Sequence, residues 1–331
     1  DASFEFGTGV NIIVGPNASG KTNLLEALLL ISNGSSYRAA DAELITHSKE
    51  WARIDVHVDG AVERSIKLQQ KKTYIIDEKE YQRLTHAKKL PIVLFEPNHL
   101  LILPGPPEGR RAYLDDLLEQ TNPEYSSLRK NYRRVVAQRN ALLKHPHAHK
   151  QDFFPWNLRL SELGAVIHRA RAELVTKLNT DIKPLYKELS SGSTEIELTY
   201  DSKFPSTEYE SRLLHALEDN LNKDIARGFT SYGPHREDMG VWFDGHLVVD
   251  VASRGETRTA TLALKILELE TLQETLNQKP ILLLDDVFSE LDGARRRALT
   301  THLQRYQTFL TTTDADIVIK HFTDSTIIPL G

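Results

Sequence analysis

The residues with the clearest chemistry form a glycine-rich loop near the start of the chain, with the order G-x-x-x-x-G-K-T. Loops of this type cradle the phosphates of a nucleoside triphosphate, because glycines let main-chain N–H groups approach the anion closely. We expect Lys21 to reach the β- and γ-phosphates and Thr22 to bind Mg²⁺. The candidate residues for binding the nucleotide are Gly15, Pro16, Asn17, Ala18, Ser19, Gly20, Lys21, Thr22 and Asn23.

The sequence on either side of this loop supplies the context that the motif requires. An apolar run over 10–14 predicts a buried strand before the loop, and residues 23–31 predict a helix with leucines on one face. The alternative is an accidental glycine turn before a core helix. The order of strand, loop and helix favours phosphate binding.

A pair of carboxylates, Asp285 and Asp286, follows a second apolar strand predicted over 281–284. The carboxyl end of a buried parallel strand lies at the edge where such sheets bind ligands. We therefore expect Asp285 to hold Mg²⁺ together with Thr22, and Asp286 to orient or deprotonate the attacking water. The alternative is a strand that merely ends in an acidic turn. The catalytic candidates are Asp286, Asp285 and Lys21.

A third element, Ser253-Arg254-Gly255-Glu256, precedes a long predicted helix. Ser253 and Glu256 have the spacing of a capping box, which is a sufficient structural explanation. Ser253, Gly255 and Glu256 are also candidates for a second anion site that faces a γ-phosphate at the start of the helix. The two interpretations are compatible.

Basic residues dominate the stretch 122–150, where Glu124 is the single acidic residue before Asp152. Residues four apart share a helical face, so we predict contact with the DNA phosphate backbone without sequence readout. The alternative is a solvated helix face or a surface for a partner protein. The candidate DNA-binding residues are Arg129, Lys130, Arg133, Arg134 and Arg139.

Composition limits the classes of protein that the chain can represent. It has 331 residues, a net charge of −5 and no cysteine, which excludes disulfides and cysteine-based zinc sites. Any contact with DNA must come from local basic patches, because the whole chain is acidic. The sequence contains neither an apolar run of membrane-spanning length nor a signal-peptide pattern.

Periodicity predicts an α/β protein in three segments. Residues 1–103 contain strands over 2–6 and 92–95 and an antiparallel meander over 51–76, with a hairpin turn at Asp59-Gly60. Residues 104–230 are mostly helical, with one long helix over 158–189, one strand over 195–200 and a helix over 209–226. Residues 231–331 return to sheet over 239–251, with Asp244-Gly245 as a hairpin turn. A helix over 256–276 and final strands over 308–310 and 327–330 follow.

The order of phosphate loop, Ser253 segment, acidic strand and Ser289-Glu290-Leu291-Asp292 is similar to that of ABC-type ATPases. The long insert before Ser253 resembles the SMC-like group, and within it the residues resemble the RecF family of bacterial recombination-repair ATPases. The matching stretches are GVNIIVGPNASGKTNLLEAL (9–28), PIVLFEP (91–97), PPEGRRAYLD (106–115), YGPHRED (232–238), SRGETRTATLALKILEL (253–269), PILLLDDVFSELD (280–292) and TFLTTTD (308–314).

This resemblance implies an ABC-type P-loop ATPase head, with a mixed sheet plus an antiparallel meander, and an inserted α-helical lobe. It implies slow, DNA-stimulated hydrolysis of ATP with Mg²⁺, and a homodimer in which Ser253 and Gly255 of one copy cover the nucleotide of the other. It also implies binding to double-stranded or gapped DNA in repair, replication and the SOS response. RecR with RecO, and indirectly RecA, would be partners in a cytoplasmic, nucleoid-associated setting without a membrane.

Two other functions remain open at this stage. One is a nucleotide-binding subunit of an ABC transporter, against which the 104–230 insert argues. The other is a structural clamp that binds ATP only to dimerise. Asp286 stands where many ABC proteins carry Glu, and its shorter side chain is consistent with very slow turnover.

Overall fold

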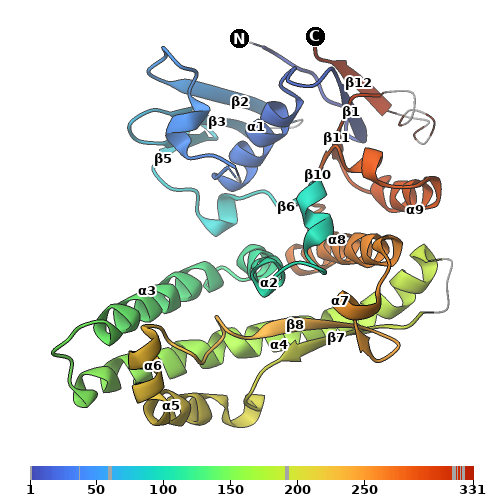
Figure 1. Ribbon diagram of the computed structural model, residues 1–331. Coiled ribbons are helices and arrows are strands. Elements are labelled where there is room, and N and C mark those ends of the chain that lie inside the picture. Colours follow the sequence, from blue (N-terminus) through green and yellow to red (C-terminus); the bar gives the residue numbers. More distant parts are fainter. Residues whose placement is uncertain are drawn as a thin grey trace. The chain divides into compact units, whose positions relative to one another are not determined.

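The computed structural model describes residues 2–36, 38–58, 62–190, 194–314, 318, 320, 322 and 325–331 (Figure 1). The chain divides into two compact units. The head unit comprises Asp1–His99 and Glu268–Gly331, and the lobe unit comprises Leu100–Leu267. The predicted second boundary at residue 230 falls inside the lobe unit, because residues 238–243 pair with a strand of that unit.

A parallel sheet forms the centre of the head unit. Its strands are β1 (Val10–Val14), β6 (Ile92–Phe95), β10 (Ile281–Asp285), β11 (Thr308–Thr312) and β12 (Ser325–Pro329), in the order β12-β1-β11-β10-β6. Every neighbouring pair is parallel. The apolar runs of β1, β6, β10 and β11 are mostly buried, as expected for parallel strands covered on both faces, whereas the edge strand β12 leaves Ile327 exposed. The predicted α/β class is confirmed, and the antiparallel pairing of the head lies in a separate sheet.

That second sheet is the predicted meander, with strands β2 (Ala52–Val58), β3 (Val62–Leu68), β4 (Thr73–Ile76) and β5 (Lys79–Tyr81). The predicted hairpin turn Asp59-Gly60 lies outside the described residues. Ile66 and Tyr74 of this sheet cluster with Leu30 and Ile31 of helix α1 (Lys21–Asn33). On its other side α1 packs its leucines against the parallel sheet. Helix α9 (Gly293–Leu303) also belongs to this unit.

The strand predicted over 2–6 is wrong, because these residues have no regular structure. Phe6 still packs its ring edge-on against Phe309, at 5.0 Å between centroids. The side chain of Asn11 bonds both the N–H and the carbonyl of Gly7. The aromatic residues are therefore held by side-chain packing, and a side chain supplies hydrogen bonds that a neighbouring strand would otherwise make.

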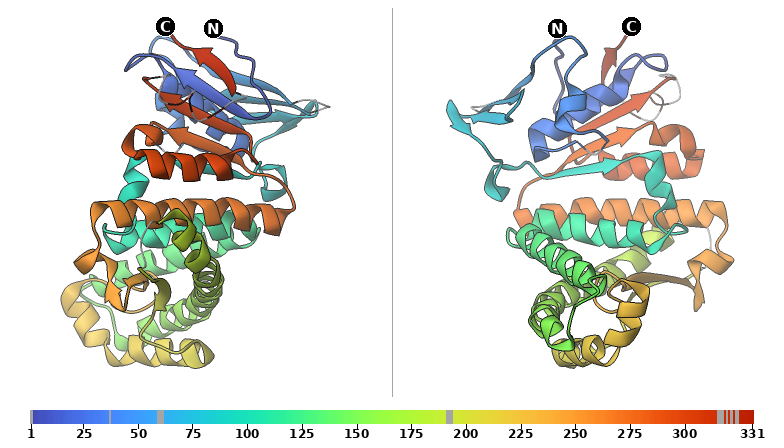
Figure 2. Two further views of the ribbon diagram at one scale, coloured as in Figure 1. Left: turned by 90° about the vertical axis from the view of Figure 1, so that its right-hand side faces the viewer. Right: turned by 60° about the vertical axis from the view of Figure 1, so that its left-hand side comes forward.

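The lobe unit is built on helix α4 (Phe154–Leu189), which runs beside α3 (Tyr125–Leu143) and α5 (Tyr209–Asp219) in all views (Figure 2). Its strands β7 (Ile196–Asp201), β8 (Asp238–Phe243) and β9 (His246–Leu247) form an antiparallel sheet. Other α-helices of the described part of this unit are α2 (Pro107–Thr121), α6 (Leu221–Arg227), α7 (Val248–Val251) and α8 (Arg254–Leu276), of which α8 continues into the head unit.

Two expectations for this unit are corrected. The helix predicted over 209–226 is interrupted at Asn220, where the backbone leaves helical geometry between α5 and α6. The sheet predicted to run to residue 251 ends at Leu247, and the valines after it form the helical turn α7 with Val249 and Val251 exposed. The β propensity of these valines therefore does not decide the local structure. In the described part of the chain, every helix is too short or too polar to cross a membrane.

Candidate nucleotide site and basic lobe

The glycine loop lies between β1 and α1, and its backbone has the form that only small residues allow. Ala18 and Gly20 adopt left-handed φ values of 67° and 96°. A Cβ on Gly15 would lie 2.4 Å from the Leu330 carbonyl oxygen and 2.5 Å from Ser19 Oγ. Gly20 caps α1 without any side-chain hydrogen bond. The first N–H groups of α1 therefore remain available to an anion.

Two polar groups in this loop fit a phosphate. Lys21 is buried, and its ammonium group donates to the carbonyl oxygens of Gly15 at 2.6 Å and Pro16 at 2.8 Å. Ser19 Oγ is buried and has no hydrogen-bond partner among the described residues. A buried hydroxyl without a partner is costly, and a phosphate oxygen would satisfy it. The residues present thus fit the triphosphate that the motif predicts.

The fold brings the two predicted metal ligands together from opposite ends of the chain. The Thr22 hydroxyl donates to Asp285 Oδ1 at 3.2 Å, and the Thr311 hydroxyl donates to the same oxygen at 2.8 Å. In the described residues, no group of three or more His, Cys, Asp or Glu could hold a metal ion. One carboxylate and one hydroxyl suit Mg²⁺, which takes its other ligands from phosphates and water.

Asp286 lies one residue beyond the strand, in a left-handed conformation with φ 53°. Its N–H donates to Thr311 Oγ1 at 2.9 Å, and Ser289 Oγ donates to its carbonyl oxygen at 2.6 Å. Burial, with a smaller contribution from the neighbouring Asp285, raises the pKa of Asp286 despite the Ser289 hydrogen bond. A carboxylate with a raised pKa is a better general base.

Sequence reasoning missed the role of Thr311, which positions both acidic residues. Its hydroxyl bonds Asp285 and accepts from the main chain of Asp286. The only available signal was the run of threonines at the end of the TFLTTTD stretch. Thr313, two residues on, is exposed.

The Ser253 segment is a capping box at the start of α8. Ser253 Oγ accepts from the Glu256 N–H at 3.2 Å, and Glu256 Oε2 accepts from the Ser253 N–H at 2.9 Å and its hydroxyl at 2.7 Å. These hydrogen bonds from Ser253 lower the pKa of Glu256. Ser253 is exposed and Gly255 is partly exposed. The structural interpretation is confirmed, and the second anion site stays a prediction.

The five basic candidates all lie on α3, but their environments differ. Arg139 is completely buried and bonds Asp224 Oδ2 at 2.8 Å and Asn157 Oδ1 at 2.8 Å. The prediction that Arg139 contacts DNA is therefore wrong, because this guanidinium holds the lobe together. Arg129 forms ion pairs with Asp115, Asp116 and Glu119, which compensate its charge.

Lys130, Arg133 and Arg134 remain exposed on the same helix. Within the described residues none of the three has a carboxylate at ion-pair distance. Their charges are available to a phosphate backbone. DNA binding by this reduced set stays a prediction.

Comparison with known proteins covers nearly the whole chain. Residues 1–327 match the family model described as the RecF/RecN/SMC N-terminal domain. The chain is 36% identical over 323 residues to the DNA replication and repair protein RecF of Halothermothrix orenii, covering 92% of this chain and 86% of that protein. It is 36% identical over 339 residues to the RecF of Symbiobacterium thermophilum, covering 97% and 90%.

Solved structures agree with this relationship. The recombination mediator protein RecF of the RecFOR pathway, solved with ATPrS, superposes with a TM-score of 0.85 at 30% identity, covering 95% of this chain and 89% of that one. The same protein with ATP gives a TM-score of 0.83. An Smc head bound to the C-terminal winged-helix domain of ScpA gives 0.53 at 16% identity and shares the fold alone.

Proposed function

The chain belongs to the RecF/RecN/SMC family, and on that basis we propose that it is a DNA-binding ATPase of recombinational repair and replication restart. The observation that carries the proposal is the convergence of Thr22 and Asp285 beside the glycine loop, 263 residues apart in sequence. Relatives solved with ATP and ATPrS support the same ligand. The repair role is supported by relatives named for DNA replication and repair.

The head residues would divide the chemistry among them. Bound ATP and Mg²⁺ supply a cleavable phosphoanhydride and a charge that polarises it. Lys21 would exchange its two carbonyl partners for phosphate oxygens, and Thr22 with Asp285 would hold the metal. Asp286 would orient a water and accept its proton. The hydrogen bonds of Thr311 to both acidic residues would hold them in position for this task.

We further propose that two copies of the chain form a composite site in the presence of ATP. Ser253, Gly255 and Glu256 of one copy would cover the nucleotide on the other. The exposure of Ser253 at the start of α8 supports this, since it can meet a second copy. The family also suggests that RecR with RecO assembles with this protein to load RecA at gaps, in a cytoplasmic, nucleoid-associated setting.

One experiment tests the ATPase proposal. Oligomeric state and hydrolysis rate are measured with ATP, with and without duplex DNA, for the wild type and for Asp286→Asn, which keeps the shape but removes the base. We expect ATP to produce dimers, DNA to stimulate hydrolysis, and the variant to lose at least about tenfold in rate while remaining dimeric. Hydrolysis at the wild-type rate in Asp286→Asn would contradict the assigned role. Dimers without any hydrolysis in the wild type would favour a structural clamp.

A second experiment tests DNA binding by the exposed part of α3. Replacing both Arg133 and Arg134 with Glu should abolish salt-sensitive binding to duplex DNA, since two attractive charges become repulsive. Binding is measured by fluorescence anisotropy between about 50 and 200 mM salt. ATP affinity is the control. Loss of ATP affinity as well would indicate misfolding and would remove the support for this surface.

A further inference from the structure

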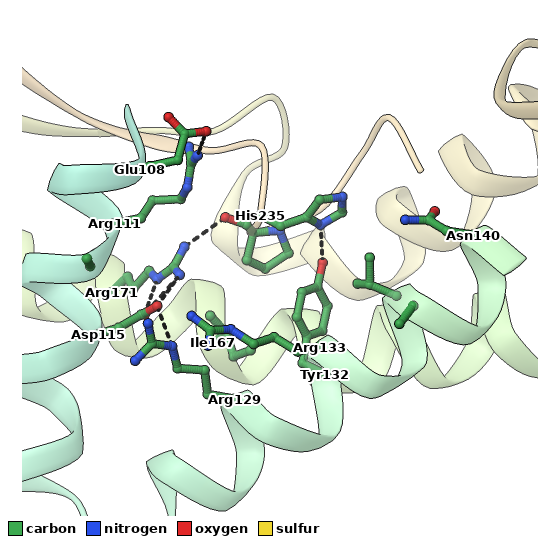
Figure 3. A pocket seen from close by; sticks show the side chains of 14 residues that line it. Glu108, Arg111, Asp115, Arg129, Tyr132, Arg133, Asn140, Ile167, Arg171 and His235 are labelled. Atoms are coloured by element: carbon green, nitrogen blue, oxygen red, sulfur yellow. Dashed lines mark hydrogen bonds and ion pairs between the residues drawn. The ribbon is translucent and has the colours of Figure 1, made fainter. Parts of the chain in front are cut away.

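The lobe unit contains a pocket of about 370 Å³ that the proposed ATPase chemistry does not use (Figure 3). Helices α2, α3 and α4 supply three of its walls, and Pro234 and His235 supply the fourth. Its volume is in the range that holds small organic ligands. It is far too small to admit a DNA duplex.

The fourth wall is held in place by the Gly233-Pro234-His235 turn. Gly233 has φ 123°, and a Cβ there would lie 2.5 Å from the Tyr132 hydroxyl oxygen. Burial lowers the pKa of His235 to about 4, so the ring is neutral at pH 7. Its Nε2–H then donates to the Thr230 carbonyl at 3.1 Å, and its Nδ1 accepts from the Tyr132 hydroxyl at 2.7 Å. The wall is thus a preformed surface.

Four arginines line the pocket, but three of them are engaged. Arg171 and Arg129 both form ion pairs with Asp115. Arg111 pairs with Glu108 and donates to the Glu237 carbonyl. Arg133 has no carboxylate at ion-pair distance among the described residues. It is the available cation of the pocket.

Asn140 provides a second available donor. Its Oδ1 accepts from both the N–H and the hydroxyl of Thr230, each at 2.8 Å, which fixes the amide orientation. The NH₂ group of Asn140 is therefore left as a donor on the pocket side. The rest of the lining includes the apolar side chains of Ala112, Val136, Ala137 and Ile167. A ligand that matches these groups carries an anion together with a partly apolar body that accepts a hydrogen bond.

We propose that this pocket binds a single unpaired nucleotide of DNA, with its phosphate on Arg133 and its base against the apolar wall beside Asn140. The proposal rests on the DNA binding proposed above and specifies the kind of DNA. A bare phosphate would leave the apolar wall uncovered. Lys130 and Arg134 are exposed on the same helix outside the pocket, so the flanking phosphates of the strand would also meet cations. An acidic peptide fits less well, because helices and a turn form the walls, with no strand edge to pair with it.

The test uses the full chain with ATP and two DNAs, an intact duplex and a gapped duplex that carries 2-aminopurine in the gap. Arg133→Ala removes the phosphate partner, and Ala137→Leu fills the pocket without changing charge. Arg134→Ala is the matched control, because it loses the same charge from the same helix outside the pocket. Thermal unfolding and ATP affinity confirm that each variant is folded.

We expect Arg133→Ala and Ala137→Leu each to weaken binding of the gapped duplex about tenfold and to abolish the fluorescence change of 2-aminopurine. Binding of the intact duplex should change less than about threefold. Arg134→Ala should weaken both DNAs by the same small factor and keep the fluorescence change. Free dAMP at millimolar concentration should compete with the gapped duplex and leave the intact duplex bound.

Equal losses for Arg133→Ala and Arg134→Ala on both DNAs would overturn the proposal, as would an unchanged fluorescence response in Ala137→Leu. Binding of dAMP without any preference for gapped DNA would assign the pocket to a free nucleotide instead. Competition by a glutamate-rich peptide but not by dAMP would assign it to a protein. If the wild type binds neither DNA, the proposed DNA-binding function fails too. If it binds gapped DNA and the pocket variants match it, only this inference fails.

Discussion

The glycine loop of the head unit and helix α3 of the lobe unit both carry cations that are conspicuous in the sequence. The hydrogen-bond partners of these cations differ in their distance along the chain. Lys21 bonds carbonyl groups five and six residues away. Arg139 bonds Asp224, which is 85 residues away. The role of the first is set by its immediate neighbours in the chain, and that of the second by the tertiary fold. Cations that are alike in sequence can therefore be held by a local loop in one place and by distant residues of the core in another.

The largest expected effect tests whether Arg139 is a core residue. Arg139→Ala leaves Asp224 buried without its partner, so the free energy of unfolding should fall by about 3–5 kcal/mol, measured by urea denaturation. Arg134→Ala, on the exposed face, should change it by less than about 0.5 kcal/mol. The double variant Arg139→Ala/Asp224→Ala should lose less than the sum of its single variants. Equal stability of the two arginine variants would remove the distinction drawn above.

The next effect tests the head side of the comparison. Lys21→Ala should weaken ATP binding by about tenfold to a hundredfold, since a hydrogen bond to a charged group contributes about 1.5–3 kcal/mol. ATP-driven dimers should be lost as well, because the composite site needs the bound nucleotide. Calorimetric titration and analytical ultracentrifugation measure the two effects. Dimers that persist with ATP in this variant would contradict the composite site.

The smallest expected effect is on the pH dependence of the free energy of unfolding, and it involves a residue of the lobe unit. The folded pKa of His235, about 4, lies below its ordinary value of 6.5. Between these values the unfolded chain binds more protons, so the free energy of unfolding falls as the pH is lowered, by up to about 1.4 kcal/mol per pH unit. His235→Gln should show a shallower slope than the wild type in this window. Identical slopes would show that His235 is not held neutral.

The parts of the site that could be predicted from sequence are those fixed by local geometry. The loop, the capping box at Ser253 and the strand that ends in Asp285 each follow from residues within a few positions of one another. Thr311 could not be assigned, because its contact with Asp285 depends on the register of two parallel strands. The burial of Arg139 could not be seen either, since a helical pattern does not reveal which distant carboxylate faces a guanidinium.

The elements of the fold that could be predicted were likewise those fixed by local sequence, and tertiary contacts decided the others. Apolar runs identified the parallel strands. The turn pair Asp244-Gly245 identified the hairpin between β8 and β9, and both residues of the pair adopt left-handed φ values. The strand expected over 2–6 failed, because Phe4 and Phe6 look like strand residues but are held by packing. The sheet expected to continue to Val251 also failed, because Val248–Val251 form a helical turn in spite of the β propensity of its valines, with Val249 and Val251 exposed.

The position of β1 in the parallel sheet has a consequence for synthesis of the protein. β1 lies between β11 and β12, so residues 10–14 pair with 308–312 and 325–329. At ribosomal rates of about 5–20 residues per second, these partner strands are synthesised roughly 15–60 s after β1. The lobe unit is continuous over Leu100–Leu267 and can form its contacts earlier. The loop that follows β1 is therefore translated before the lobe unit, but its surroundings are completed only after β11 and β12 have been made.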